Sequence, residues 1–255
     1  MSFHSKIILI TGASSGIGAA TAIHFSKLGA KLALTGRNLV NLQHVADQCE
    51  QSFSLKPFLV TGDLTNEDDT KHILNSTISH YNQLDVLVNN AGILESGSIE
   101  STSLDQYDRI MNANVRSIYH LTMLAVPHLI KTKGNIVNVS SVNGVRSFAN
   151  VLAYCMSKSA VDQFTRCVAL ELAPKGVRVN SVNPGVVETN ILTRQGMSKE
   201  DYAIFLEKTK VTHALGRPGT PEEVAKAIAF LAGDASFSTG DSLLVDGGRH
   251  AMCPR

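Results

Sequence analysis

Tyr154 and Lys158 are four residues apart, a spacing that puts a phenol and an ammonium group on one face of a helix. A free phenol ionises at about pH 10, and a neighbouring ammonium favours the phenolate and lowers that pKa. Tyr154 could then donate a proton to a nascent alkoxide or take one from an alcohol. Taken alone, Tyr-x-x-x-Lys is more often a half-buried tyrosine beside a solvated lysine, so its meaning depends on the other motifs.

A glycine-rich segment from Thr11 to Gly18 follows an apolar strand pattern and opens a helical one. Glycines in such a turn let the backbone approach a pyrophosphate, and the helix N-terminus offers free N–H groups to phosphates. The spacing is G-x-x-x-G-x-G. The turn predicts dinucleotide binding. Together with the Tyr–Lys pair, it predicts an enzyme that moves a hydride on or off a carbonyl carbon.

The same turn also fits a competing motif. Residues 12–16 read G-x-S-x-G, the nucleophile elbow of α/β-hydrolases, and His213 and His250 could complete a triad. That elbow would follow the first strand, with no earlier strand to supply an oxyanion hole. It would also leave Tyr154 and Lys158 without a role. We therefore favour the redox interpretation.

The elements that must position these residues follow a regular alternation of short apolar runs and longer helical patterns. The runs are continuously hydrophobic, as in parallel strands buried on both faces, and lie at residues 6–10, 31–35, 57–60, 86–88, 135–139, 177–182 and 242–245. Capping-box patterns at Ser103–Gln106 and Thr220–Glu223 mark two helix starts. The alternation predicts an α/β fold: a doubly wound, Rossmann-type sheet of seven parallel strands with helices on both faces.

The domain organisation is simple, because no linker, repeat or low-complexity segment interrupts the alternation. We predict a single domain over residues 1–255. The irregular segment 186–218 is longer than a plain connection, and such segments often cover a binding site. We expect it to act as a substrate lid.

Composition limits the classes of partner. A net charge of +1 without like-charge runs argues against nucleic acid, and no apolar stretch approaches the roughly 20 residues that span a bilayer. The cysteines lack metal-ligand spacing, so we expect reduced structural thiols and no metal at Cys49, Cys155, Cys167 and Cys253. The N-terminal residues show no signal-peptide pattern, and we expect a cytoplasmic protein acting on a small molecule.

These motifs together resemble the short-chain dehydrogenase/reductase family over nearly the whole chain. The resemblance rests on segments in the family order: Thr11–Gly18, Asp63–Leu64, Asn89–Gly92, Asn112–Val115, Val139–Val142, Tyr154–Lys158, Asn183–Thr189 and Asp246–Gly248. It implies catalytic roles for four residues. Asn114 would position a proton-relay water, Ser141 would hydrogen-bond the substrate oxygen, Tyr154 would be the acid/base, and Lys158 would activate it and hold the nicotinamide ribose. Ser141 is chosen over Ser140 for its spacing to Tyr154.

The resemblance also implies a nicotinamide cofactor and the residues that contact it. These are Gly12, Ser14, Ser15, Gly16, Ile17, Gly18, Arg37, Asn38, Asp63, Leu64, Asn90, Ala91, Gly92, Tyr154, Lys158, Pro184, Gly185, Val187 and Thr189.

The end of the second strand predicts which nicotinamide is used. NAD-binding dinucleotide folds carry an acidic residue there for the ribose 2′-hydroxyl, whereas this chain has Gly36 followed by Arg37. A guanidinium binds phosphate in a bidentate fashion, which suits the 2′-phosphate of NADP. The second basic residue usual in NADP-preferring members is replaced by Ser15. We predict a preference for NADP(H), with NAD(H) use by an alcohol dehydrogenase of the same family as the alternative.

The substrate and the assembly are less strongly indicated. Apolar residues in the expected lid and nearby suggest a mostly apolar ketone or alcohol, although they could equally pack a small helix pair: Leu94, Phe148, Ile191, Leu192, Met197, Tyr202, Ile204, Phe205 and Leu206. The closest subgroup resemblance is to 3-oxoacyl-carrier-protein reductases, a pattern shared with carbonyl, steroid and sugar reductases. The family resemblance implies a homotetramer assembled through the helix that carries Tyr154 and the C-terminal strand region. The apolar pattern of a further set of residues fits a buried helix face, in the core or at an interface: Val161, Phe164, Val168 and Leu172. A cofactor-binding sensor or scaffold without catalysis is the remaining alternative, which the intact catalytic set disfavours.

Overall fold

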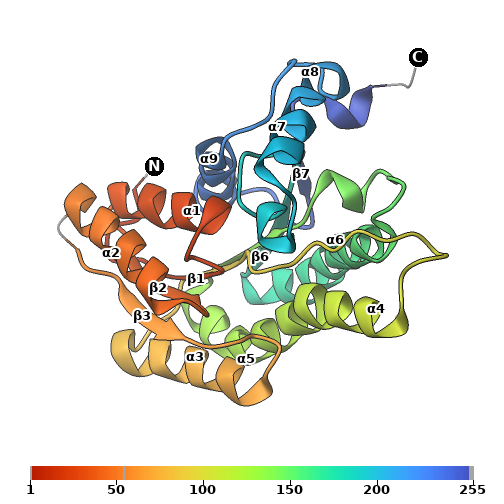
Figure 1. Ribbon diagram of the computed structural model, residues 1–255. Helices are drawn as coiled ribbons and strands as arrows, with labels where there is room; N and C mark the ends of the chain where they lie inside the picture. The colour runs from red at the N-terminus through yellow and green to blue at the C-terminus, as the bar shows by residue number, and fades with distance from the viewer. Residues whose placement is uncertain (1, 54, 253–255) are drawn as a thin grey trace.

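A twisted parallel sheet forms the centre of the molecule (Figure 1). The computed structural model describes residues 2–53 and 55–252, so Cys253 lies outside the described residues. The strands run in the order β3-β2-β1-β4-β5-β6-β7, which confirms the doubly wound sheet of seven parallel strands. Their bounds are β1 Ile7–Thr11, β2 Lys31–Gly36, β3 Phe58–Thr61, β4 Val86–Asn89, β5 Asn135–Val139, β6 Arg178–Pro184 and β7 Ser242–Val245.

Several strands extend one or two residues beyond the hydrophobic runs that predicted them. Thr11 pairs with Thr35, and Asn89 pairs with Asn138, although polar side chains had ended the apolar pattern before them. Backbone pairing does not depend on side-chain polarity, so the ladder continues. Several of the polar residues that follow the apolar runs therefore lie at the carboxyl edge of the sheet, where a ligand can reach them.

Helices cover both faces of the sheet (Figure 1). One layer contains α1 Gly16–Lys27, α2 Leu39–Phe53 and α9 Pro221–Ala232. The other contains α3 Glu67–Tyr81, α4 Leu104–Met111, α5 Ser117–Thr132 and α6 Leu152–Leu172. Two further helices, α7 Lys199–Glu207 and α8 Thr209–Thr212, belong to the segment between β6 and α9. None of the helices in the described ranges is both long and apolar enough to cross a membrane.

The two faces of the sheet bury separate hydrophobic clusters. Ile8 and Ile10 of β1 pack with Phe25 on the α1 side, whereas Leu9 packs with Leu121 on the α5 side. Ile8, Leu9 and Ile10 are all fully buried. Because successive side chains of a strand point to opposite faces, burial on both faces requires a continuous apolar run.

Local capping explains where two helices begin. At α9 the Thr220 hydroxyl accepts from the Glu223 N–H at 3.3 Å and the Glu223 carboxylate accepts from the Thr220 N–H at 2.9 Å, which confirms the predicted capping box. At α4 the Ser103 hydroxyl accepts from the Gln106 N–H at 3.2 Å. The Gln106 amide instead donates to the Ser96 carbonyl, so this start is a simple cap rather than a reciprocal box.

The strand order places a crevice beside β1. This strand pairs with β2 on one side and β4 on the other, so the connections leave it in opposite directions. In open α/β sheets, ligands bind at the carboxyl ends of the strands where the order reverses. The glycine turn after β1 and the Asn90–Gly92 segment after β4 both lie at this point.

Candidate active site

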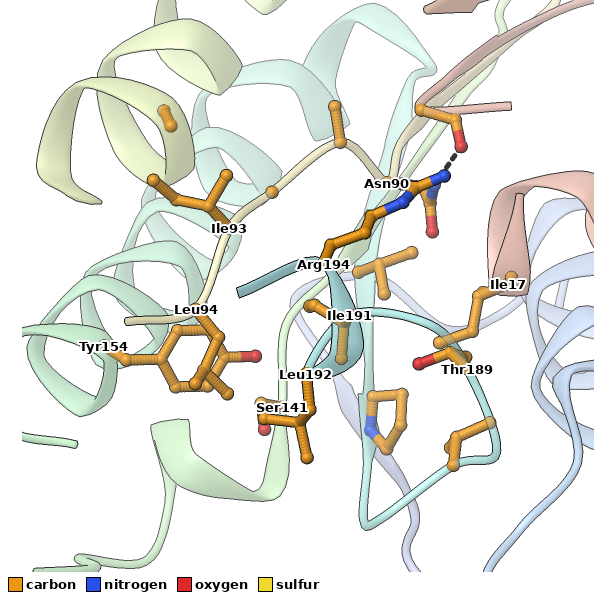
Figure 2. Close-up of a pocket in the computed structure, with 18 of the residues that line it drawn as sticks. Ile17, Asn90, Ile93, Leu94, Ser141, Tyr154, Thr189, Ile191, Leu192 and Arg194 are labelled. Carbon is orange, nitrogen blue, oxygen red and sulfur yellow. Dashed lines mark hydrogen bonds between the residues drawn. The ribbon is translucent and has the colours of Figure 1, made fainter. Parts of the chain in front are cut away.

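A cavity of about 700 Å³ opens at the carboxyl ends of the strands (Figure 2). It brings together most of the residues predicted from the sequence: Gly12, Ser14, Ser15, Gly16, Ile17, Arg37, Asp63, Leu64, Asn90, Ala91, Gly92, Ser141, Tyr154, Lys158, Pro184, Gly185, Val187 and Thr189. Three predicted residues do not line it, namely Gly18, Asn38 and Asn114.

The glycine turn forms a tight backbone cradle after β1. Gly12 has a φ of +62°, and a Cβ there would lie 2.9 Å from the Ala91 backbone. A Cβ on Gly18 would collide with the Gly12 carbonyl, so Gly18 serves close packing beneath the cradle rather than the cavity wall. The Asn90 amide donates to the Thr11 carbonyl at 2.8 Å. This bond joins the segment after β4 to the end of β1.

The N-terminus of α1 faces this cradle and fits an anionic ligand. The Ser15 side chain at the N-cap satisfies none of the described helix N–H groups, and the first turn of α1 carries no acidic side chain. Unsatisfied N–H groups and the positive end of the helix dipole together favour a phosphate. The backbone cradle and this helix start therefore fit the diphosphate of a dinucleotide.

Arg37 and Asp63 face each other farther along the cavity. The Arg37 guanidinium lies 3.7 Å from the Asp63 carboxylate, whose other oxygen accepts from the Thr65 hydroxyl at 2.8 Å. Partial burial acts to raise the pKa of Asp63, but the Thr65 hydrogen bonds and the Arg37 charge outweigh it and lower that pKa. Asn38 is exposed, and its side chain accepts from the Asn41 N–H at the start of α2. It is a helix cap here.

Tyr154 and Lys158 lie on α6, and both are almost fully buried. The Lys158 ammonium donates to the Val139 carbonyl at 2.9 Å and lies 5.6 Å from the centre of the Tyr154 ring. The Ser140 hydroxyl donates to the Lys158 carbonyl and so bonds the residue after β5 to the backbone of α6. The end of β5 therefore sets the position of the lysine relative to the tyrosine.

Burial determines the acidity of both groups. It raises the pKa of Tyr154 to about 12, with a Ser141 hydrogen bond opposing the shift. It lowers the pKa of Lys158 to about 8, with the charge of Asp162 opposing that shift. The sequence-based expectation of a lowered pKa for this phenol is wrong for this structure, because desolvation outweighs any stabilisation of the phenolate by Lys158. Tyr154 keeps its proton at neutral pH and is suited to act as an acid.

Ser141 lies where β5 ends. Its hydroxyl accepts from the Asn143 N–H at 3.1 Å and donates to the Asn143 side chain at 3.2 Å, which caps the turn Val142–Gly144. Figure 2 shows the Ser141 and Tyr154 side chains on the same side of the pocket, with Ile191 and Leu192 of the segment 186–218 nearby. Two hydroxyl groups therefore border one part of the cavity.

Asn114 stands behind the cavity wall. It belongs to a π-helical turn, Asn112–Arg116, which joins α4 to α5. Its side chain accepts from the Ile93 N–H at 2.8 Å, and its amide donates to the Ile93 carbonyl at 2.8 Å and to the Ser157 hydroxyl at 3.0 Å. Asn114 thus positions the loop after β4. The sequence pattern did not predict the π turn.

Asp162 is a buried carboxylate that the sequence analysis missed. It is 1% exposed, one helical turn after Lys158, and it receives two hydrogen bonds from the Asn183 amide at 2.9 and 3.1 Å. Its charge acts to raise the pKa of Lys158. The i+4 spacing from Lys158 was the available signal, because it places both side chains on one helix face.

The predicted lid crosses the cavity between β6 and α9. Its apolar residues divide into two groups: Ile191, Leu192, Met197 and Phe205 line the cavity with Leu94 and Phe148, whereas Tyr202, Ile204 and Leu206 do not. The Tyr202 hydroxyl instead donates to the Thr189 carbonyl at 2.8 Å and accepts from its N–H at 3.1 Å. Two arginines that the sequence analysis missed, Arg194 and Arg249, also line the cavity.

The fold and the site together indicate a class of protein. A doubly wound sheet, a phosphate-sized cradle at its switch point and a buried tyrosine–lysine pair beside it are the parts of a nicotinamide-dependent oxidoreductase. A family model described as enoyl-(acyl carrier protein) reductase matches residues 12–250.

Known proteins agree with that class along almost the full chain. Meso-2,3-butanediol dehydrogenase of Serratia marcescens is 37% identical, covering 98% of this chain and 97% of its own. A 3-oxoacyl-[acyl-carrier-protein] reductase of Thermotoga maritima is 35% identical, covering 97% and 99%. The crystal structure of a short-chain dehydrogenase/reductase of unknown function from Caenorhabditis elegans, with cofactor, is 35% identical and covers 98% and 97% with a TM-score of 0.93. The chain belongs to the short-chain dehydrogenase/reductase family, as its motifs predicted.

Proposed function

We propose that this protein is an NADP(H)-dependent oxidoreductase that interconverts a ketone and a secondary alcohol. The observation that carries the proposal is the buried Tyr154 hydroxyl beside Ser141 in the cavity that also holds the dinucleotide cradle. A bound nicotinamide supplies or accepts the hydride. A relative that is 37% identical is named for oxidation of a diol, which is chemistry of this kind.

The side chains provide the proton and stabilise the charge that develops. Reduction of a ketone places negative charge on its oxygen, and Tyr154 delivers a proton there. Ser141 stabilises the same oxygen when its hydroxyl turns from Asn143 toward the cavity. Once both hydroxyl groups point at the oxygen, little reorganisation remains for the reaction itself, and that lowers the barrier.

Lys158 has donors available for the cofactor. An ammonium carries three N–H donors, and the Val139 carbonyl takes one of them. We propose that the others bind the ribose hydroxyls of the nicotinamide half. The fixed bond to Val139 would orient the ammonium for that contact.

Replacing Lys158 with methionine tests this role. We expect dinucleotide affinity to fall by about 10-fold or more, because hydrogen bonds from charged groups are among the strongest in proteins. We also expect the pKa in the pH–rate profile to rise, since a nearby positive charge favours the phenolate. Fluorescence titration with NADPH and a pH–rate profile measure the two effects. Lys175→Met, on an exposed turn, is the matched control. Unchanged affinity would remove Lys158 from the cofactor site.

The substrate end of the cavity supports a partly apolar ketone. Leu94, Phe148 and Leu192 border it. A panel of aliphatic, cyclic and aromatic ketones, followed by NADPH and NADH oxidation at 340 nm, tests the proposed activity. Turnover of at least one ketone is expected. Tight dinucleotide binding without turnover of any ketone or alcohol would favour the non-catalytic sensor instead.

We also propose that the chain forms a homotetramer through its α5–α6 layer. Tyr119, Met123 and Leu170 are 59%, 53% and 78% exposed on these helices and would be covered by a second copy. Val161 and Leu172, which the sequence analysis placed on a core or interface face, are buried within the chain. Light scattering measures the assembly. The thiols of Cys49, Cys155 and Cys167 are free, which supports a reducing compartment such as the cytoplasm.

A further inference from the structure

Arg249 brings a positive charge to the substrate side of the cavity. It follows β7 in the short turn Arg249–Ala251, and its guanidinium lies 4.4 Å from the centre of the Phe148 ring. Phe148 belongs to the segment that joins Ser141 to Tyr154 in the chain, and all four residues line the same cavity. Arg249 is therefore grouped with the reacting hydroxyls rather than with the phosphate cradle.

Hydrogen bonds from Arg146 and to Asp246 hold the turn that carries Arg249. The Arg146 guanidinium donates to the His250 carbonyl at 2.8 Å and to the Met252 carbonyl at 3.2 Å. The Asp246 carboxylate accepts from the Gly248 N–H at 3.0 Å and from the His250 N–H at 2.7 Å. These bonds hold the turn in place, and stacking on Phe148 orients the guanidinium.

The Arg249 guanidinium has no anionic partner within the described residues. No carboxylate in residues 2–53 and 55–252 forms an ion pair with it. The nearby Asp246 is occupied by backbone donors and by the His250 ring at 2.9 Å. Burial lowers the pKa of Arg249, and Asp246 only partly opposes that shift. A half-buried cation without a partner attracts an anion.

The charged side chains that line the cavity are mostly cationic. Arg37, Lys158, Arg194 and Arg249 line it, and Asp63 is the one carboxylate among the described lining residues. Asp63 already faces Arg37, and Lys158 is bonded to Val139. The cradle at α1 is placed for the cofactor's diphosphate. Arg194 and Arg249 then remain without an ion-pair partner among the described residues, and of the two it is Arg249 that lies against Phe148 on the substrate side.

We propose that Arg249 binds a carboxylate of the substrate, so that the physiological substrate is an oxo acid or the corresponding hydroxy acid. This inference rests on the proposed function of the same site. A guanidinium offers paired N–H groups that match the two oxygens of a carboxylate. In the reaction the ketone carbon gains the hydride, its oxygen gains the Tyr154 proton, the nicotinamide is oxidised, and the carboxylate is unchanged.

A series of matched substrates tests the proposal. The substrates are 3-oxobutanoate, 4-oxopentanoate and 5-oxohexanoate, each compared with its neutral amide, because acid and amide have nearly the same shape. We expect one acid to exceed its amide in kcat/KM by about 10-fold or more, since a hydrogen-bonded charge pair contributes that much. The chain length with the largest ratio would report the distance from the reacting carbonyl to Arg249.

Variants assign the effect to the guanidinium. Arg249→Met keeps an apolar contact with Phe148 and should reduce the acid-to-amide ratio to about one, whereas Arg249→Lys should retain part of it. Arg166→Gln, an exposed arginine on α6 outside the cavity lining, should keep the full ratio. Binding of the unreactive glutarate to the NADP⁺-saturated protein, measured by calorimetry, should weaken in Arg249→Met.

The outcomes separate this inference from the proposed function. Equal kcat/KM for acids and amides, with turnover of both, would overturn the role of Arg249 and leave the ketone reductase intact. An Arg249→Met variant that keeps the wild-type ratio would overturn that role as well. Failure of every ketone in both series to be reduced would overturn the proposed function, and the substrate class with it.

Discussion

Tyr154→Phe is expected to lower kcat by about 10²–10⁴-fold and to leave dinucleotide affinity nearly unchanged, because only the proton donor is lost. The ring and its packing stay, and the backbone of α6 is not disturbed. Burial raises the pKa of the Tyr154 hydroxyl to about 12, so this hydroxyl carries its proton at neutral pH. We therefore expect the variant to lose the proton-transfer step, with the fall in rate confined to kcat.

Steady-state kinetics with the best ketone of the panel and NADPH titration measure the two quantities. Tyr107→Phe, which removes a hydroxyl on α4 away from the cavity lining, is the matched control and should keep wild-type rates. A Tyr154→Phe variant that keeps more than about a tenth of the wild-type kcat would exclude Tyr154 as the acid.

Exchange of Gly36 for aspartate together with Arg37 for isoleucine should reverse the cofactor preference. In the wild type we expect NADPH to exceed NADH by about 10-fold in kcat/KM, from one charge-assisted contact to the 2′-phosphate. The Arg37 side chain is 72% exposed, so solvent screening keeps the expected preference for NADPH from being much larger. Most of the change should be in KM, because the 2′-group is remote from the reacting carbon.

The structure has room for the new carboxylate. A Cβ at Gly36 would lie 3.3 Å from the Ser14 hydroxyl and 3.7 Å from Leu42, so a small adjustment accommodates it. Each single variant is measured beside the double one. Equal use of both cofactors by the wild type, or no response to Arg37→Ile, would leave Arg37 as the solvent-exposed partner of Asp63.

The fold was predictable because its signals are local and repeated. Strands buried on both faces need continuous apolar runs, and residues such as Ile8, Leu9 and Ile10 supply one. The glycine cradle was predictable for a similar reason. Side chains do not fit at Gly12 or Gly18, so this backbone conformation requires glycine, and the glycines are visible in the sequence.

The rest of the site depends on contacts between distant segments, which single-residue patterns do not encode. The pKa of Tyr154 moved up because the fold buries it, an effect that the spacing to Lys158 cannot report. Asn114 lies in a π turn between two α-helices. A π turn contains more residues than an α turn, and this changes the direction in which the side chains point. Arg249 meets Phe148 through a contact between the turn after β7 and the segment after β5, which lie about a hundred residues apart in the chain.

The buried ammonium of Lys158 has a consequence for the stability of the whole protein. Its pKa in the folded chain is about 8, below the value of about 10.4 for an exposed lysine, so folding is opposed by the loss of hydration. That penalty is complete below about pH 8 and disappears as the pH rises through the unfolded-state value. Lys158→Met should therefore melt at a higher temperature than the wild type at pH 7, with the difference shrinking by about pH 10.5. A buried ammonium of this kind lowers stability at neutral pH, so the proposed role of Lys158 at the cofactor is expected to trade stability against activity.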